Sequence, residues 1–90
     1  MAIGPTYRIL FKPSAAKSLG KLPTKARALM TATIDALATD PRPPGHVKMT
    51  DSPGLYRVRS GSYRAIYGIE DDRLVVCVLK VGDRKEIYDR

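Results

Sequence analysis

The chain has 90 residues, enough for one hydrophobic core but not for two. Sixteen Lys and Arg residues against nine Asp and Glu residues give a formal charge of +7, which favours polyanionic partners, nucleic acid first and acidic proteins second. The hydrophobic content of 43% is typical of a folded domain, and so small a domain excludes a deep pocket for a large cofactor. We therefore expect a single domain over residues 1–90.

The cysteine content and the hydropathy pattern indicate the cellular compartment in which the protein is expected. Cys77 is the only cysteine, which excludes an internal disulfide and a multi-cysteine zinc cluster and is typical of a reducing environment. No apolar run approaches the roughly 18 residues that a membrane helix needs, and no signal-peptide pattern opens the chain. The sequence thus predicts a cytoplasmic protein without a membrane segment.

The first elements are a strand and a short helix. Apolar and polar residues alternate over residues 7–11, which predicts a half-buried strand that Pro13 closes. Ser14 is placed to be the N-cap of a short helix, and Gly20 stands where that helix would end.

A longer amphipathic helix follows Pro23 and Thr24. Its apolar residues recur at three- and four-residue spacings: Ala26, Leu29, Met30, Ile34 and Leu37. The Pro- and Gly-rich residues 41–45 cannot continue a helix, so we expect it to stop near Asp40 and a loop to extend to about residue 53.

The second half of the chain has the pattern of a strand meander. Strands are predicted over residues 55–60, 63–69 and 74–81, with a turn around Gly61 and an acidic, solvated turn over residues 70–73. The last strand is apolar on both of its faces, as is typical of a central strand that is covered on both sides. The order β-α-α-β-β-β predicts an α+β domain in which two helices pack on one face of a largely antiparallel four-stranded sheet.

Three arginines are predicted to share one face of this meander. Side chains two residues apart point to the same side of a strand, so Arg57 and Arg59 lie together. A turn at Gly61 would bring Arg64 beside them. Like charges at this spacing are costly unless an anion binds between them or the side chains bend into solvent. We favour anion binding.

The end of the chain adds another arginine and a tyrosine. Gly82 supplies a bend, after which Arg84 and Tyr88 follow. The planar fork of an arginine matches a phosphate, and an aromatic ring stacks on an unpaired base, a combination suited to single-stranded RNA. The alternative for Tyr88, a half-buried ring that completes the core, stays open.

Three stretches together resemble the RelE type of the RelE/ParE toxin superfamily, small basic partners in toxin–antitoxin pairs. They are residues 55–67, residues 78–88 and the helix end at residues 37–41. The strand order derived from periodicity agrees with the fold of that family.

The resemblance implies metal-independent cleavage of messenger RNA in the ribosomal A site, with no cofactor and with a cognate antitoxin as the protein partner. By match, Arg64 is the transition-state arginine, Arg84 assists the leaving 5′-oxygen, and Tyr88 stacks on the nucleotide or activates it. Four further basic residues are predicted to bind RNA: Arg57, Arg59, Lys48 and Lys85.

Two departures from the family pattern bear on activity. Asp83 stands beside Arg84 where relatives often carry histidine, and its carboxylate can orient or partly neutralise that arginine. Ser62 replaces an acidic residue that is common in the turn. Two alternatives remain: a ParE-like inhibitor of DNA gyrase, whose family shares the fold but usually lacks the arginine set and the terminal tyrosine, and, because of Asp83, a relative that binds RNA without cutting it.

The remaining reactive side chains are interpreted as structural. His46 is the only histidine, which excludes a two-histidine ribonuclease mechanism, and its place in the Pro- and Gly-rich loop favours a structural loop residue. Cys77 lies inside an apolar strand, as a small buried residue does.

Overall fold

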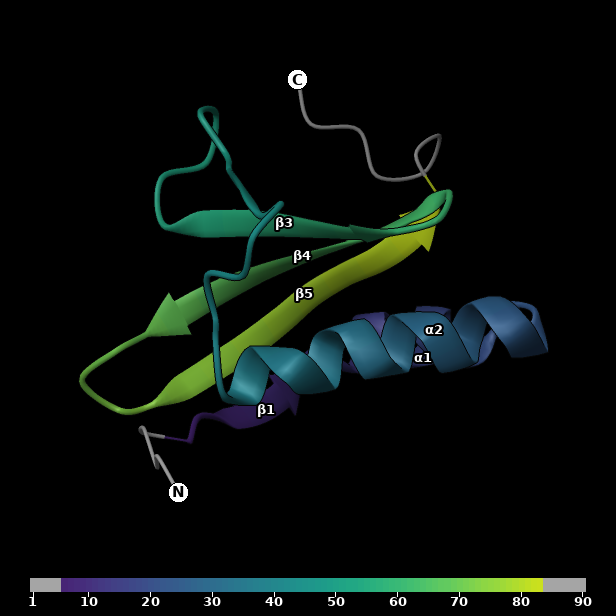
Figure 1. Ribbon diagram of the computed structural model, residues 1–90, viewed down its shortest axis with the longest axis horizontal. Helices are drawn as coiled ribbons and strands as arrows, with labels where there is room; N and C mark the ends of the chain where they lie inside the picture. Colours follow the sequence, from purple (N-terminus) through teal and green to yellow (C-terminus); the bar gives the residue numbers. More distant parts are fainter. Residues whose placement is uncertain (1–5, 84–90) are drawn as a thin grey trace.

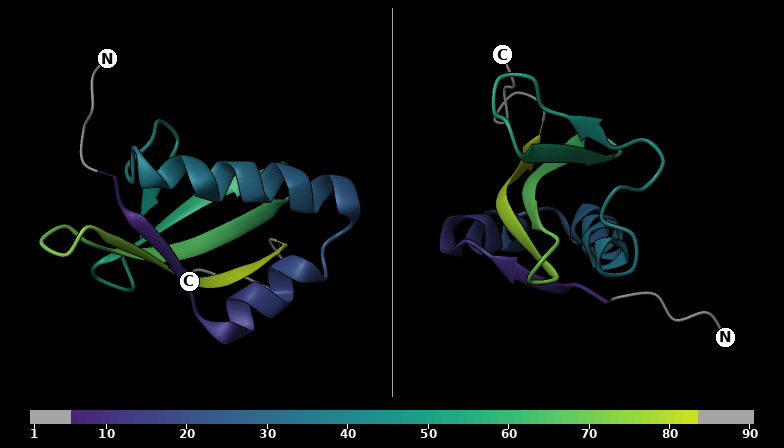
Figure 2. Two further views of the ribbon diagram at one scale, coloured as in Figure 1. Left: turned by 90° about the horizontal axis from the view of Figure 1, so that it is seen from below. Right: turned by 90° about the vertical axis from the view of Figure 1, so that its left-hand side faces the viewer.

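The computed structural model describes residues 6–83, and the structural statements below concern those residues. A five-stranded sheet of order β1-β5-β4-β3-β2 carries both helices on one face and leaves the opposite face of β3, β4 and β5 without a helix (Figures 1 and 2). The elements are β1 (Arg8–Phe11), α1 (Pro13–Gly20), α2 (Thr24–Asp35), the 3-10 turn η1 (Ala36–Ala38), β2 (Val47–Lys48), β3 (Leu55–Ser60), β4 (Tyr63–Glu70) and β5 (Val75–Asp83). The predicted α+β class is confirmed.

The sheet is antiparallel except at one pairing. β1 runs parallel to β5, so β5 has a hydrogen-bonded neighbour on each side, as its apolar sequence indicated. The fifth strand, β2, lies in the segment expected to be a loop. It pairs only two residues with β3, which is too short to leave a periodic pattern in the sequence.

The helix ends differ from the predicted ones. α1 begins at Pro13 with Lys12 as its N-cap, so the assignment of Ser14 as the cap is wrong. Proline suits the first helical position because its φ is already helical and its missing N–H would have no partner there. α2 ends at Asp35, and η1 continues the turn to Ala38, two residues before the predicted stop.

One core lies between the helices and the sheet. Its buried members are Ala15 from α1, Met30 and Ile34 from α2, Leu37 from η1, and Val58, Ala65, Tyr67, Val76, Val78 and Val81 from the sheet. A smaller cluster of Met49 and Ile66, with Leu55 against it, lies on the opposite face. The sheet therefore has a fully packed face under the helices and a partly covered face behind them.

The β3–β4 turn fixes the register of that second face. Ser60 pairs with Tyr63, so Gly61 and Ser62 form a two-residue loop. Gly61 has φ +62° and is the one loop residue with a positive φ, which is the pattern of a type II′ turn. Such a turn follows the right-handed twist of the two strands and holds them in a single alignment.

Within residues 6–83, none of the helices is long and apolar enough to cross a membrane.

Candidate functional site

The three predicted arginines do lie on one face. Arg59 pairs directly with Arg64. Arg57, two residues before Arg59 on the same side of β3, pairs with Ile66. Val58 and Ala65, which alternate with them, are buried under the helices. We call the side of β3, β4 and β5 that carries Arg57, Arg59 and Arg64 the arginine face. Its existence was predicted from the period of two and from the glycine turn.

The arginine face is not uniformly solvated. Arg59 is exposed, whereas Arg57 and Arg64 are half-buried and the Nε atom of Arg64 is shielded from solvent. Ile66, beside them, is only 5% exposed because it packs with Met49 and Leu55. Guanidinium groups above an apolar floor, partly withdrawn from water, attract an anion more strongly than fully solvated ones do.

Of the other predicted site residues, the structure describes only Lys48, which is not part of this cluster. Lys48 pairs with Tyr56, so it has the opposite parity to Arg57 and belongs to the other side of the sheet. Arg84, Lys85 and Tyr88 lie outside the described residues, and their roles stay predictions.

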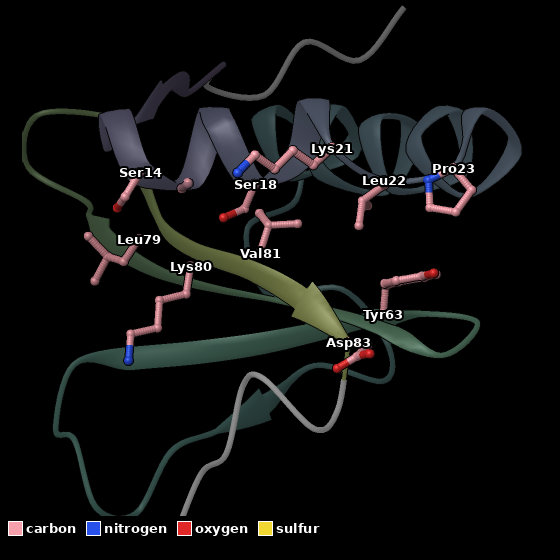
Figure 3. Close-up of a pocket in the computed structure, with 11 residues that line it drawn as sticks. Ser14, Ser18, Lys21, Leu22, Pro23, Tyr63, Leu79, Lys80, Val81 and Asp83 are labelled. Atoms are coloured by element: carbon pink, nitrogen blue, oxygen red, sulfur yellow. The ribbon is translucent and has the colours of Figure 1, made fainter.

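Asp83 also falls on the other side. It pairs with Tyr63, whose ring packs against the helix-covered core, whereas Gly82 is the residue that pairs with Arg64. Asp83 lines a hollow of about 550 Å³ between the end of β5 and the α1–α2 connection, together with Lys21 and Leu22 (Figure 3). By register, the carboxylate that raised doubt about catalysis is therefore outside the arginine face.

Sequence reasoning missed Lys80. Strict alternation from Val76 and Val78 would put this lysine under the helices, but the register shifts between Ile66 and Tyr67 and leaves Leu79 as an extra residue. Lys80 consequently pairs with Ile66 and joins the arginine face. The signal in the sequence was a lysine within an otherwise apolar run, which a bulge explains and simple alternation does not.

An ion-pair cluster holds the loop after η1 against the β4–β5 turn. Arg42 donates two hydrogen bonds to Asp71, at 3.2 Å to Oδ1 and 2.9 Å to Oδ2, and the Tyr7 hydroxyl donates to Oδ1 at 2.7 Å. Hydrogen bonds from Arg42 and Tyr7 lower the pKa of Asp71, and the same Asp71 contact raises the pKa of Tyr7. The acidic turn is exposed, as predicted, but Asp71 has a structural partner.

An aromatic stack continues from this cluster into the core. The guanidinium of Arg42 lies 5.4 Å from the ring centre of Tyr56, which stacks on Tyr67 at 5.8 Å. Tyr67 is fully buried, donates to the Pro41 carbonyl at 2.7 Å, and has its pKa raised by burial to about 12. These contacts fix the start of the loop that leads into β2.

His46 completes the loop. Its Nδ1 lies 2.8 Å from the Pro43 carbonyl, which can only accept, so Nδ1 carries the proton. Its ring contacts Tyr56 with centres 5.8 Å apart. The histidine packs in the loop, in agreement with the interpretation of His46 as a loop residue.

The arrangement on the arginine face suits an anion that gains charge. Three arginines from two adjacent strands share one side of the sheet, and each guanidinium carries its donors in a fixed plane. Within residues 6–83, no three His, Cys, Asp or Glu side chains gather as metal ligands would. Guanidinium groups in such an arrangement can bind a phosphate and stabilise negative charge that develops on it.

Comparison with known proteins identifies the family. Residues 9–88 match the family model for the ParE toxin of type II toxin-antitoxin system, parDE. The chain is 31% identical over 85 residues to toxin RelG of Mycobacterium tuberculosis, an alignment that covers 93% of this chain and 98% of that protein. The chain belongs to the RelE/ParE toxin superfamily.

Two further RelE/ParE relatives agree with this assignment. The mRNA interferase toxin RelE of Escherichia coli is 30% identical over 86 residues, covering 91% of this chain and 90% of that one. A toxin-antitoxin complex from Mycobacterium tuberculosis contains a chain that superposes with a TM-score of 0.77 at 27% identity, covering 88% of this chain and 92% of that one. The resemblance stated from the sequence is confirmed.

Proposed function

We propose that this RelE/ParE-family toxin is a ribosome-dependent endoribonuclease that cuts messenger RNA in the A site. The observation that carries the proposal is the arginine face, where Arg59 and Arg64 pair directly across β3 and β4 and Arg57 lies in the adjacent position. The name of the similar Escherichia coli protein, an mRNA interferase, supports the same substrate.

The proposed reaction begins with attack of a ribose 2′-oxygen on the adjacent phosphorus. The P–O bond to the 5′-oxygen of the next nucleotide breaks, leaving a 2′,3′-cyclic phosphate and a 5′-hydroxyl. The proton of the 2′-hydroxyl passes to a base such as water, and the leaving 5′-oxygen takes up one proton, so the reaction releases no net proton. Negative charge grows on the non-bridging oxygens in the transition state, and preorganised guanidinium groups stabilise it there.

Each arginine has a proposed part in this reaction. Arg64, half-buried with a shielded Nε, is the group best placed to stabilise the transition state. Arg57 and Arg59 hold the RNA backbone. An arginine stays protonated at neutral pH, so these roles are electrostatic. Arg84 would assist the leaving oxygen and Tyr88 would stack on the nucleotide.

The decisive experiment maps the 5′ ends of messages on purified programmed ribosomes. Wild-type protein should cut within the A-site codon, and Arg64→Ala should lower the cleavage rate about 10²- to 10³-fold, the usual effect of removing one such donor. The matched control is Arg73→Ala, an arginine in the β4–β5 turn whose partner is Glu70. Unchanged cleavage by Arg64→Ala would remove that arginine from the mechanism.

Binding of a cognate antitoxin is the second part of the proposal. Structurally similar chains have been solved as toxin–antitoxin complexes. The net charge of +7 favours an acidic or amphipathic antitoxin segment that covers part of the arginine face. A co-expressed antitoxin should suppress both growth arrest and cleavage.

The alternative is inhibition of DNA gyrase, which the match to a ParE family model favours. A supercoiling assay separates the two activities. Protein that blocks gyrase but leaves ribosome-bound message intact would establish the alternative, and protein that cuts message but leaves supercoiling unaffected would exclude it.

A further inference from the structure

The β-bulge in β5 changes which residues of that strand lie on the arginine face. Ile66 pairs with Lys80 whereas Tyr67 pairs with Val78, so Leu79 has no counterpart on β4. The parity of β5 is therefore reversed beyond Leu79: Val81 is buried under the helices and Lys80 is exposed on the opposite side. Figure 3 shows this reversal, with Val81 directed toward the helices and Lys80 extended away from them.

Lys80 lies in register with the arginine face. Arg57, Ile66 and Lys80 stand abreast on β3, β4 and β5, and Arg64 lies in the neighbouring row. Two strand spacings separate the backbone of Arg57 from that of Lys80 by roughly 10 Å, and the two rows are about 7 Å apart. Buried Ile66 is the floor between the two cationic side chains.

We propose that Lys80 binds the RNA backbone at a phosphate next to the scissile one, an inference that rests on the proposed function. Arg57 lies beside Ile66 on β3, and Arg64 lies two residues before Ile66 on β4. A phosphate held between these two arginines leaves Lys80, on β5, to bind the neighbouring phosphate. An ammonium on a flexible stem suits this task because it neutralises a phosphate without demanding one orientation. Lys80 should therefore contribute to message binding and not to the chemical step.

The test measures binding separately from cleavage. Ribosomes are programmed with a message that carries a 2′-deoxy nucleotide in the A site and so cannot be attacked. The affinity of the protein for these ribosomes is compared with its affinity for ribosomes whose message ends after the P-site codon, at several monovalent salt concentrations and constant Mg²⁺. The difference between the two affinities is the codon-dependent gain. The variants are Lys80→Ala, Lys80→Arg and, as matched control, Lys25→Ala, an exposed lysine in the first turn of α2.

The expected result is confined to the codon-dependent part of binding. Lys80→Ala should reduce the affinity gained from the A-site codon about three- to tenfold and lower its salt slope by about 0.7, the value for one phosphate on a single strand. Lys80→Arg should keep both at the wild-type value, and Lys25→Ala should change neither. With cleavable message, Lys80→Ala should keep the wild-type kcat while its KM rises.

Several results would overturn the assignment of Lys80. In the binding assay they are an unchanged codon-dependent gain in Lys80→Ala, an equal loss on ribosomes without an A-site codon, and an equal loss in Lys25→Ala. A wild-type chain that shows the Lys80-dependent gain but leaves a 2′-hydroxyl message intact contradicts the proposed nuclease function alone. Cleavage that survives Lys80→Ala with unchanged KM contradicts the role of Lys80 alone, and a wild-type chain without any codon-dependent gain contradicts both.

Discussion

Arg59 and Arg64 occupy directly opposed positions of the β3–β4 hairpin, with both side chains on the face opposite α1 and α2. Like charges directly opposite each other destabilise a sheet. The register persists because the intervening pair, Val58 and Ala65, is buried in the core, and a slip by one residue would expose these apolar side chains. The fold thus holds two like charges in opposed positions at a cost to stability, which the proposed binding of an anion would offset.

Removing one charge of this pair should favour folding and impair activity. We expect Arg59→Gln to raise the free energy of unfolding by about 0.2–1 kcal/mol at low salt, because it relieves a like-charge pair. The gain should shrink at high salt as screening weakens the repulsion. Urea unfolding at two ionic strengths measures it. Arg73→Gln is the control and should show no gain, since it breaks the 2.9 Å pair with Glu70. A loss of stability in Arg59→Gln at low salt would contradict the repulsion.

The conformation of Gly61 should determine how stable this hairpin is. At φ +62° a side chain with a Cβ is strained, so Gly61→Ala should cost about 1–2 kcal/mol. Gly61→Asn should cost less, because asparagine is one of the residues that occupy the positive-φ positions of such turns. No neighbouring atom lies within 4 Å of a Cβ built at Gly61, so the difference reports backbone strain and not a clash. Equal costs for the two variants in urea unfolding would contradict this explanation.

The arginine face was predictable from the sequence because its determinants are local. The period of two places Arg57 and Arg59 together, and a glycine turn returns the chain to Arg64. Lys80 could not be placed in this way, because one extra residue in β5 reverses which side chains face the helices. The surrounding residues are apolar on both sides of the strand, so their pattern does not show where the extra residue lies. The partner of Asp71 was also beyond prediction, because Arg42 lies 29 residues away and the contact depends on the assembled fold.

The contact of Arg42 with Asp71 should appear as acid sensitivity. The pKa of Asp71 is lowered in the folded protein, so its contribution to stability is present above the unfolded value near 3.8 and is lost as the pH falls through the lower folded value. Thermal unfolding from pH 7 to pH 2 should show this loss in the wild type. The Asp71→Asn variant should be less stable at pH 7 and should lose less on acidification. Asp72→Asn, the same change one residue along the turn, should follow the wild type, and identical profiles for all three proteins would contradict a stabilising role for the pair.

Tyr67 should make the protein sensitive to alkali. Its folded pKa is raised to about 12 from the unfolded value of 10.0, so the stability linked to its neutral form is complete below pH 10 and is lost as the pH rises toward 12. Tyr67→Phe should cost about 1–2 kcal/mol at neutral pH, because the Pro41 carbonyl loses the hydrogen bond that it accepts at 2.7 Å. That variant should also lose less stability than the wild type between pH 10 and pH 12, so the two urea-unfolding curves should approach each other there.

Tyr63→Phe is the control for that experiment, since it removes a hydroxyl from a half-buried ring on the same strand. It should retain the alkaline loss of the wild type. Parallel pH profiles for the wild type and Tyr67→Phe would mean that the phenol ionises as easily in the folded chain as in the unfolded one. Tyr67 stacks on Tyr56, the neighbour of Arg57 in β3. Cleavage assays on the same variants at neutral pH therefore test whether the buried stack supports the arginine face. If it does, cleavage should fall in Tyr67→Phe more than in Tyr63→Phe.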